Sequence, residues 1–184
     1  FALELDYTRC MMAFLLFHAQ PRRALMIGLG GGSLAKFFHR RIAGLRTHVV
    51  EYDERVIATA RALFHVPGDG VHALAPECCD LLVVDGYEDE TTPAAMVSQA
   101  FFDAAWCALE EPGVFVMNVM DDDKALDRHL QRIEHAFGGA VLAFKALRDP
   151  NIVVIGLKGA PAAVEWRVLR ARAFRCGQVG ALQQ

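Results

Sequence analysis

The sequence predicts an α/β fold built on a doubly wound, mostly parallel sheet with an antiparallel hairpin at its C-terminal end. Three observations predict it. Short apolar runs alternate with segments of helical character, a glycine turn joins the first apolar run to a helix, and the last two runs flank Arg148-Asp-Pro-Asn151, a turn signal. With 184 residues and 54% hydrophobic content, the chain is long enough for one well-buried domain, and we expect a single domain over 1–184.

The expected strands are short and apolar, as buried strands of a parallel sheet should be. In chain order they are 24–27, 47–51, 81–84, 114–119, 141–147 and 152–157. The spacing between 64 and 81 leaves a short Gly68-Asp69-Gly70 and no clear strand. We therefore expect the third strand of the sheet to be reduced or missing, at an edge where its loss costs least.

The expected helices are bounded by capping and stop signals. They are 6–18, 33–41, 54–64, 71–75, 98–109, 121–137 and 162–174. Asp6 is the expected N-cap of the first helix, which Gln20-Pro21 ends, so residues 1–20 should form an N-terminal helix that covers the domain. Asp53 can cap 54–64, and Pro112-Gly113 ends 98–109.

Charge and composition limit the partners. The formal net charge is -3, from 19 basic and 22 acidic side chains, which argues against nucleic acid and favours a small ligand. The apolar run 11–17 is too short to span a membrane, so no membrane association is expected. The five cysteines contain no Cys-x-x-Cys, and we expect a reducing cytoplasm as the location. A homodimer is left open.

The most informative stretch is the turn in which Gly28, Gly30 and Gly32 form Gly-x-Gly-x-Gly. Glycine lets the backbone approach a ligand and adopt positive φ, and such a turn points a helix N-terminus at bound groups. The spacing is usual for nucleoside-sulfonium sites of the S-adenosylmethionine type. A dinucleotide fingerprint fails from Gly28, where Ser33 takes the third place, but fits from Gly30 to Ala35. The glycines alone do not select the ligand.

Three acids are expected near the carboxyl ends of the strands, where open α/β sheets bind ligands. Glu51 is placed to accept hydrogen bonds from two ribose hydroxyls, or is a solvated acid that starts the next helix. Asp69 faces an adenine amino group or is a plain turn residue. Asp85, followed by Gly86, projects into the site or caps a helix.

Other polar groups have more ordinary interpretations. Glu88, with the acids beside it, makes the mouth of the site attractive to a cation or forms a solvated loop. The run Asp121 to Asp123 suits the dipole of a helix start better than a metal, and no metal is expected. His129 and His135 lack metal-ligand spacing and are expected at the surface.

Four stretches in this order resemble the spermidine synthase (polyamine aminopropyltransferase) family. They are Leu-Met-Ile-Gly-Leu-Gly-Gly-Gly-Ser, Val-Val-Glu-Tyr-Asp, Gly-Asp-Gly, and Leu-Leu-Val-Val-Asp-Gly-Tyr-Glu. The resemblance covers about 1–120 and implies a Rossmann-like domain of the class I methyltransferase type. It also implies a transferase of polyamine biosynthesis that uses decarboxylated S-adenosylmethionine as co-substrate and a small amine as acceptor.

The resemblance implies roles for individual residues. Asp85 matches the catalytic aspartate, Glu88 the second acid, and Tyr7 a tyrosine that positions the amine. Glu51 would hold the ribose of the donor, and Asp69, beside Gly70, its adenine.

The sequence also departs from the family pattern. Ser33 replaces an aspartate that binds the aminopropyl amine or its acceptor, and Thr8-Arg9 stand where the family has His-Glu. Two alternatives therefore stay open: an S-adenosylmethionine-dependent methyltransferase, and a non-catalytic nucleoside-binding domain.

Overall fold

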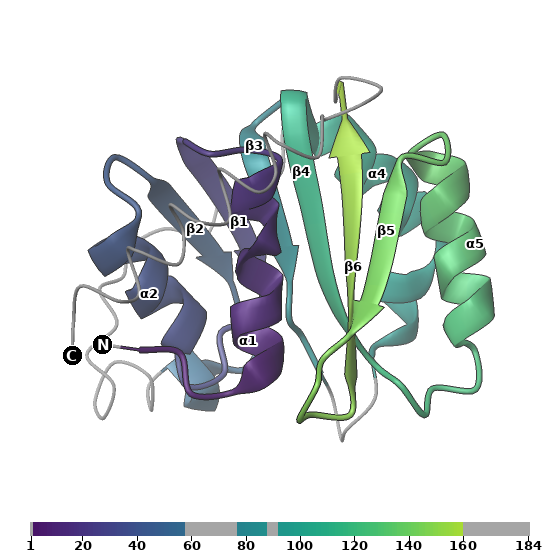
Figure 1. The fold of residues 1–184 in the computed structure, drawn as a ribbon, viewed down its shortest axis with the longest axis horizontal. Helices are drawn as coiled ribbons and strands as arrows, with labels where there is room; N and C mark the ends of the chain where they lie inside the picture. The colour runs from purple at the N-terminus through teal and green to yellow at the C-terminus, as the bar shows by residue number, and fades with distance from the viewer. Residues whose placement is uncertain (1, 58–76, 88–91, 160–184) are drawn as a thin grey trace.

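The structure, a computed structural model, describes residues 2–57, 77–87 and 92–159. Its centre is a six-stranded sheet in the order β2-β1-β3-β4-β6-β5 (Figure 1). The strands are β1 (Arg23–Ile27), β2 (Arg46–Val50), β3 (Cys79–Val84), β4 (Leu109–Met120), β5 (Val141–Lys145) and β6 (Asn151–Lys158). The pairs β1–β2, β1–β3 and β3–β4 are parallel, whereas β6 runs antiparallel to both β4 and β5. The predicted mostly parallel sheet with a terminal hairpin is confirmed.

Helices cover both faces of the sheet (Figure 1). Helix α1 (Asp6–Met11), its 3-10 extension η1 (Met12–Leu16) and α2 (Ser33–Arg41) pack on one face. On the other face lie the 3-10 turn η2 (Ala94–Val97), α4 (Gln99–Ala108) and α5 (Leu126–Ala136).

Each face has its own apolar core. Phe14 of η1 and Phe38 of α2 meet edge to face, with ring centroids 5.9 Å apart. On the opposite face Phe102 packs on Phe115 at 6.1 Å. Both Phe102 and Phe115 are completely buried. The side chains of neighbouring strand residues alternate between the two faces, so β4 contributes to both cores.

Side-chain caps are visible at two helix starts, and the one at Asp53 was predicted. The Asp53 carboxylate accepts from the Arg55 N–H at 2.8 Å, as a cap does. Ser98 is the N-cap of α4, and its hydroxyl accepts from the Phe101 N–H at 3.1 Å.

Two helix starts were predicted wrongly. Leu5, not Asp6, is the N-cap of α1, because the Asp6 carboxylate reaches the β5–β6 hairpin instead. Helix α5 begins at Leu126 rather than at 121–123, and Asp123 caps the preceding turn by accepting from the Ala125 N–H at 2.8 Å. The expected helices at 71–75 and 162–174 lie outside the described residues, as does most of the segment between 64 and 81 in which a third strand was expected to be reduced or missing.

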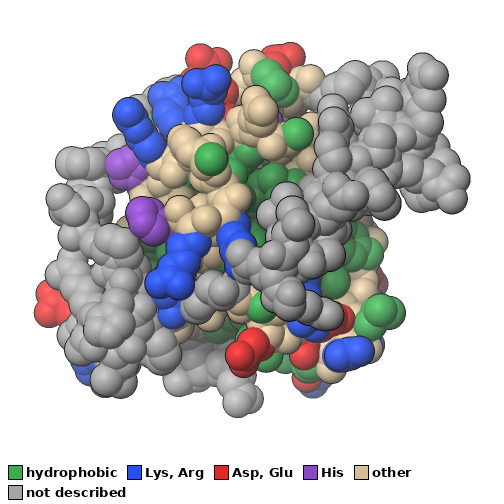
Figure 2. All heavy atoms as spheres, turned by 60° about the vertical axis from the view of Figure 1, so that its left-hand side comes forward, with side chains coloured by type: hydrophobic (Ala, Val, Ile, Leu, Met, Phe, Trp, Pro, Cys, Tyr) green, Lys and Arg blue, Asp and Glu red, His purple; other side chains and the backbone are tan. Residues whose placement is uncertain are grey.

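Lys and Arg side chains, together with histidines, gather on the face of the molecule that carries α2 and β2 (Figure 2). The last turn of α2 contributes His39, Arg40 and Arg41, which suits the negative end of the helix dipole. In the part of the chain that the structure describes, no helix combines the length and the apolar character needed to cross a membrane.

Candidate active site

Strand register brings four predicted or newly found site residues into one row. Ile27 of β1 lies opposite both Val50 of β2 and Val84 of β3, and Val84 lies opposite Met117 of β4. The next residue on each strand therefore reaches the same edge of the sheet. From β2 to β4 these residues are Glu51, Gly28, Asp85 and Asn118. This edge holds the carboxyl ends of four parallel strands, where α/β sheets bind their ligands.

The three glycines of the turn have different structural roles. Gly28, at φ 92°, donates its N–H to the Val50 carbonyl at 2.9 Å. A Cβ on Gly28 would lie 2.2 Å from the carbonyl oxygen of Asp85, so this glycine lets β1 and the end of β3 approach each other. Gly30, at φ 49°, has open space where its Cβ would be. Gly32, at φ 68°, is the N-cap of α2, so Ser33 opens that helix.

Glu51 is tied to the glycine turn. Its Oε2 accepts from the Leu29 N–H at 3.0 Å, and its Oε1 accepts from the N–H groups of Tyr52 at 2.9 Å and Asp53 at 3.1 Å. A carboxylate has about four acceptor positions. Described residues occupy three of them, which leaves about one for a ligand hydroxyl within this part of the chain.

Asp85, directly after β3, is hydrogen-bonded to groups from two other elements. Its Oδ1 accepts from Asn118 Nδ2 at 2.9 Å, and its Oδ2 from the Tyr7 hydroxyl at a long 3.4 Å. Burial raises the pKa of Asp85, and the hydrogen bonds from Asn118 and Tyr7 offset the rise only in part. Burial and the neighbouring Asp85 also raise the pKa of Tyr7. Tyr7 is therefore a protonated donor toward a carboxylate that binds protons more readily than usual.

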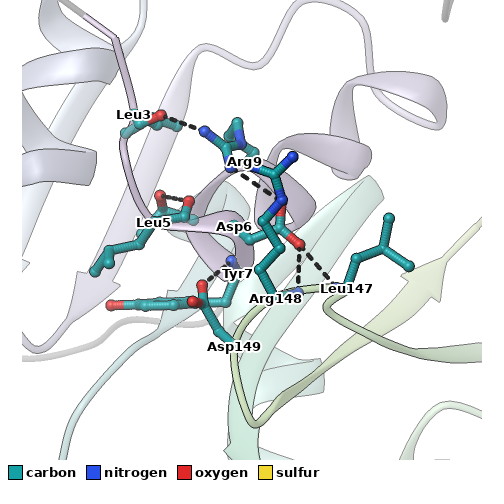
Figure 3. Close-up of polar contacts among 9 residues, drawn as sticks. Leu3, Leu5, Asp6, Tyr7, Arg9, Leu147, Arg148 and Asp149 are labelled. Atoms are coloured by element: carbon teal, nitrogen blue, oxygen red, sulfur yellow. Dashed lines mark hydrogen bonds and ion pairs between the residues drawn. The ribbon is translucent and has the colours of Figure 1, made fainter.

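Contacts between α1 and the β5–β6 hairpin hold Tyr7 at this edge (Figure 3). The Tyr7 N–H donates to Asp149 Oδ2 at 2.9 Å. Asp6 precedes Tyr7 in α1. Its Oδ2 accepts from the N–H groups of Leu147 at 2.7 Å and Arg148 at 3.2 Å. The segment 147–149 thus fixes the start of α1, and with it the direction of the Tyr7 side chain.

Three polar residues of the site were not predicted from the sequence. Asn118 and Asn151 are 2% and 7% exposed, and Asn151 Nδ2 donates to Asn118 Oδ1 at 3.0 Å. The hydroxyl of Tyr87 is buried and lies beside Asn151, with no well-formed hydrogen bond to any described residue. Burial raises the pKa of Tyr87, and the nearby Asp85 and Tyr7 raise it further. Asn118 interrupts the apolar run Val114 to Val119, a signal that could have identified it.

The other candidate site residues either lie away from the row of Glu51, Gly28, Asp85 and Asn118 or are not among the described residues. His129, expected at the surface, is only 5% exposed, and its Nε2 lies 3.2 Å from Asp123 Oδ2. Asp121 pairs with Lys145, and no group of His, Cys, Asp and Glu among the described residues has the arrangement of a metal site. Asp69, Gly70 and Glu88 are not among the described residues.

Known proteins with a similar fold include methyltransferases and spermidine synthases. Human methyltransferase-like protein 13, solved in complex with SAH, superposes with a TM-score of 0.83 at 22% identity, over 95% of this chain and 92% of its own. A probable spermidine synthase from Corynebacterium glutamicum gives a TM-score of 0.74 at 22% identity, over 93% of this chain and 71% of its own. These likenesses confirm the predicted Rossmann-like fold of the class I methyltransferase type.

Sequence similarity goes further than the fold. The sequence matches no family model. The polyamine aminopropyltransferase of Chromobacterium violaceum, however, is 33% identical in an alignment of 183 positions that covers 93% of this chain and 70% of that relative. The chain is therefore a transferase that belongs to the polyamine aminopropyltransferase family.

Proposed function

We propose that this chain transfers an aminopropyl group from decarboxylated S-adenosylmethionine to a small amine, with Asp85 as the general base. The observation that carries the proposal is the row of Glu51, Gly28, Asp85 and Asn118 along one edge of the sheet. It combines a carboxylate beside the glycine turn with a second, proton-binding carboxylate two strands away.

The donor would bind at the glycine turn. The described residues fit an adenosyl group there, because Gly30 leaves open space and Glu51 keeps about one acceptor position for a ribose hydroxyl. Gly28, Gly32 and Ser33 shape the turn and the start of α2. Asp69 and Gly70 stay proposed adenine contacts on the resemblance alone.

Asp85 would act on the acceptor. An aliphatic amine is mostly protonated near neutral pH and must lose a proton before it can attack. The ammonium is attracted to the Asp85 carboxylate and gives it that proton, which the raised pKa of Asp85 favours. Tyr7, and by resemblance Glu88, would orient the amine.

The transfer then balances without further reagents. The neutral amine nitrogen attacks the aminopropyl carbon, the new C–N bond forms, and the C–S bond breaks with its electron pair going to sulfur. The sulfonium becomes the neutral thioether of methylthioadenosine, and the positive charge passes to the product ammonium. No acid is needed for the leaving group, and alignment of the three reacting atoms supplies much of the acceleration.

Incubation with decarboxylated S-adenosylmethionine and putrescine tests the proposal. The wild type should form methylthioadenosine, and Asp85→Asn should lower kcat by a factor of about 10² to 10⁴. Asp103→Asn is the matched control, because Asp103 is an exposed acid on α4. Equal activity of Asp85→Asn and the wild type would refute the role of Asp85.

One observation favours methyl transfer as a second candidate. The first turn of α2 contains no acid, so its N-terminus suits the carboxylate that S-adenosylmethionine keeps and the decarboxylated donor lacks. Calorimetry separates the two functions. An aminopropyltransferase should bind methylthioadenosine at least as tightly as S-adenosylhomocysteine, and a methyltransferase should clearly prefer the latter.

A further inference from the structure

Two buried asparagines form a chain of hydrogen bonds that ends on Asp85. Asn118 lies in β4 and Asn151 begins β6, in neighbouring antiparallel strands. Asn151 Nδ2 donates to Asn118 Oδ1 at 3.0 Å, and Asn118 Nδ2 donates to Asp85 Oδ1 at 2.9 Å. Among the described residues, Asn151 makes no hydrogen bond to Asp85 itself, so it reaches the acid through Asn118.

The direction of this chain matters because the two ends of an amide differ. One end of the asparagine side chain only accepts hydrogen bonds and the other only donates. Since Asn151 occupies the accepting end of Asn118, the donating end faces Asp85. A donor at that position stabilises the ionised carboxylate. The reversed arrangement would point the Asn118 oxygen at Asp85, and only a protonated Asp85 could then hydrogen-bond to it.

Other groups around Asp85 do little to keep it ionised. The Tyr7 hydroxyl is 3.4 Å from Oδ2, a long contact, and among the described residues the Tyr87 hydroxyl, which lies beside Asn151, makes no hydrogen bond to Asp85. The acids Asp149 and Asp123 lie near Tyr7 and Tyr87, where their negative charges help to raise the pKa of those two tyrosines. Among the described residues, no Lys or Arg forms an ion pair with Asp85.

We propose that Asn151 is a positioning residue for the transfer: by fixing the amide of Asn118, it holds Asp85 ionised with Oδ1 occupied and leaves Oδ2 to take the proton of the acceptor. The role in transfer rests on the proposed function. The hydrogen-bond relay itself does not, because the protonation of Asp85 can be measured without any substrate.

The test is a ¹³C NMR titration of the Asp85 carboxyl in the full chain. Asn151→Ala should raise the pKa of Asp85 by about 1 unit, since a hydrogen bond to a charged group corresponds to a shift of about 1 to 2 units. Val154→Ala is the control. Val154 of β6 is completely buried in the apolar core that contains Phe102 and Phe115. Truncating its side chain to alanine should leave the pKa of Asp85 unchanged.

A double substitution separates the relay from a direct effect. In an Asn118→Ala background the relay is already broken, so adding Asn151→Ala should shift the pKa of Asp85 no further. If Asn151→Ala does not fold, Asn151→Asp keeps the side-chain size. The new carboxylate at 151 would accept from the Asn118 Nδ2 group and so reverse the Asn118 amide. Asn151→Asp should therefore raise the pKa of Asp85, and this rise should be smaller when Asn118 is also replaced by Ala.

The outcomes are distinct. A shift that needs Asn118 supports the relay, and an acid limb of kcat/KM that moves with it supports the role in transfer. A pKa of Asp85 within about 0.2 units of wild type in a folded Asn151→Ala, or a shift independent of Asn118, overturns the proposal. If the shift appears but no amine yields product, the relay stands and the proposed function fails.

Discussion

Gly28→Ala is expected to damage the fold far more than the same change at Gly30. The Cβ of an alanine at 28 would lie 2.2 Å from the Asp85 carbonyl oxygen and 2.6 Å from its carbon. Both are backbone atoms of the neighbouring strand end, which cannot turn aside as a flexible side chain would. Position 28 also has φ 92°, a conformation that costs L-residues about 1 to 2 kcal/mol.

The two costs add to a large loss for so small a change. Overpacking costs about 1 to 3 kcal/mol, so Gly28→Ala should lower the free energy of unfolding by about 2 to 5 kcal/mol in total. Gly30→Ala, at φ 49° with open space around its Cβ, should lose only about 1 to 2 kcal/mol. Urea denaturation of both variants at one pH gives the two values.

The comparison also tests the job assigned to each glycine. If Gly30 leaves room for a ligand, Gly30→Ala should weaken the binding of methylthioadenosine more than its small stability loss suggests. Equal destabilisation by the two alanines would show that the close approach between β1 and the end of β3 is not what requires Gly28.

Three further substitutions have defined outcomes. Glu51→Gln should weaken methylthioadenosine binding about tenfold in calorimetry, because a charge-assisted hydrogen bond to the ribose is lost; unchanged affinity would contradict the ribose role. Asp80 accepts from the N–H groups of Arg22 at 2.7 Å and Arg23 at 2.9 Å. Burial raises the pKa of Asp80, but hydrogen bonds from His18 and these two N–H groups lower it more, so the pKa lies below the ordinary 3.8. Asp80→Asn should therefore destabilise the fold by about 1 to 3 kcal/mol at pH 7, and this difference should disappear as the pH falls below 3.8 through the lower folded-state pKa; a constant difference in urea unfolding down to pH 2 would be inconsistent. Lys158, 6% exposed, donates from Nζ to the carbonyls of Trp106 at 2.9 Å and Leu109 at 2.6 Å, so Lys158→Met should cost about 2 kcal/mol in thermal or urea unfolding, whereas exposed Lys145→Met should stay within about 0.5 kcal/mol.

Local signals in the sequence predicted most of the fold. The glycine turn, the Asp53 cap and the apolar strand runs depend on interactions within a few residues of each other in the sequence, so periodicity and turn chemistry were sufficient. The parallel direction of the first strands followed from the β-α-β alternation. The row of Glu51 and Asp85 with the glycine turn followed in turn, because parallel strands end at the same edge.

Contacts between distant segments were not predictable in the same way. The Asp6 side chain had the chemistry of an N-cap, but the hairpin segment at Leu147 and Arg148 offers it two N–H groups instead. Asn118 and Asn151 meet only because of the register between β4 and β6. His129 is buried because the orientation of α5 turns it toward Asp123 rather than toward solvent.

A crystal structure with methylthioadenosine tests the central claim most directly. The account predicts that the ribose lies on Glu51, the nucleoside follows the glycine turn at Gly28 to Gly32, and the thioether sulfur points toward Asp85. A nucleoside bound elsewhere, with neither Glu51 nor Asp85 beside it, would contradict the account.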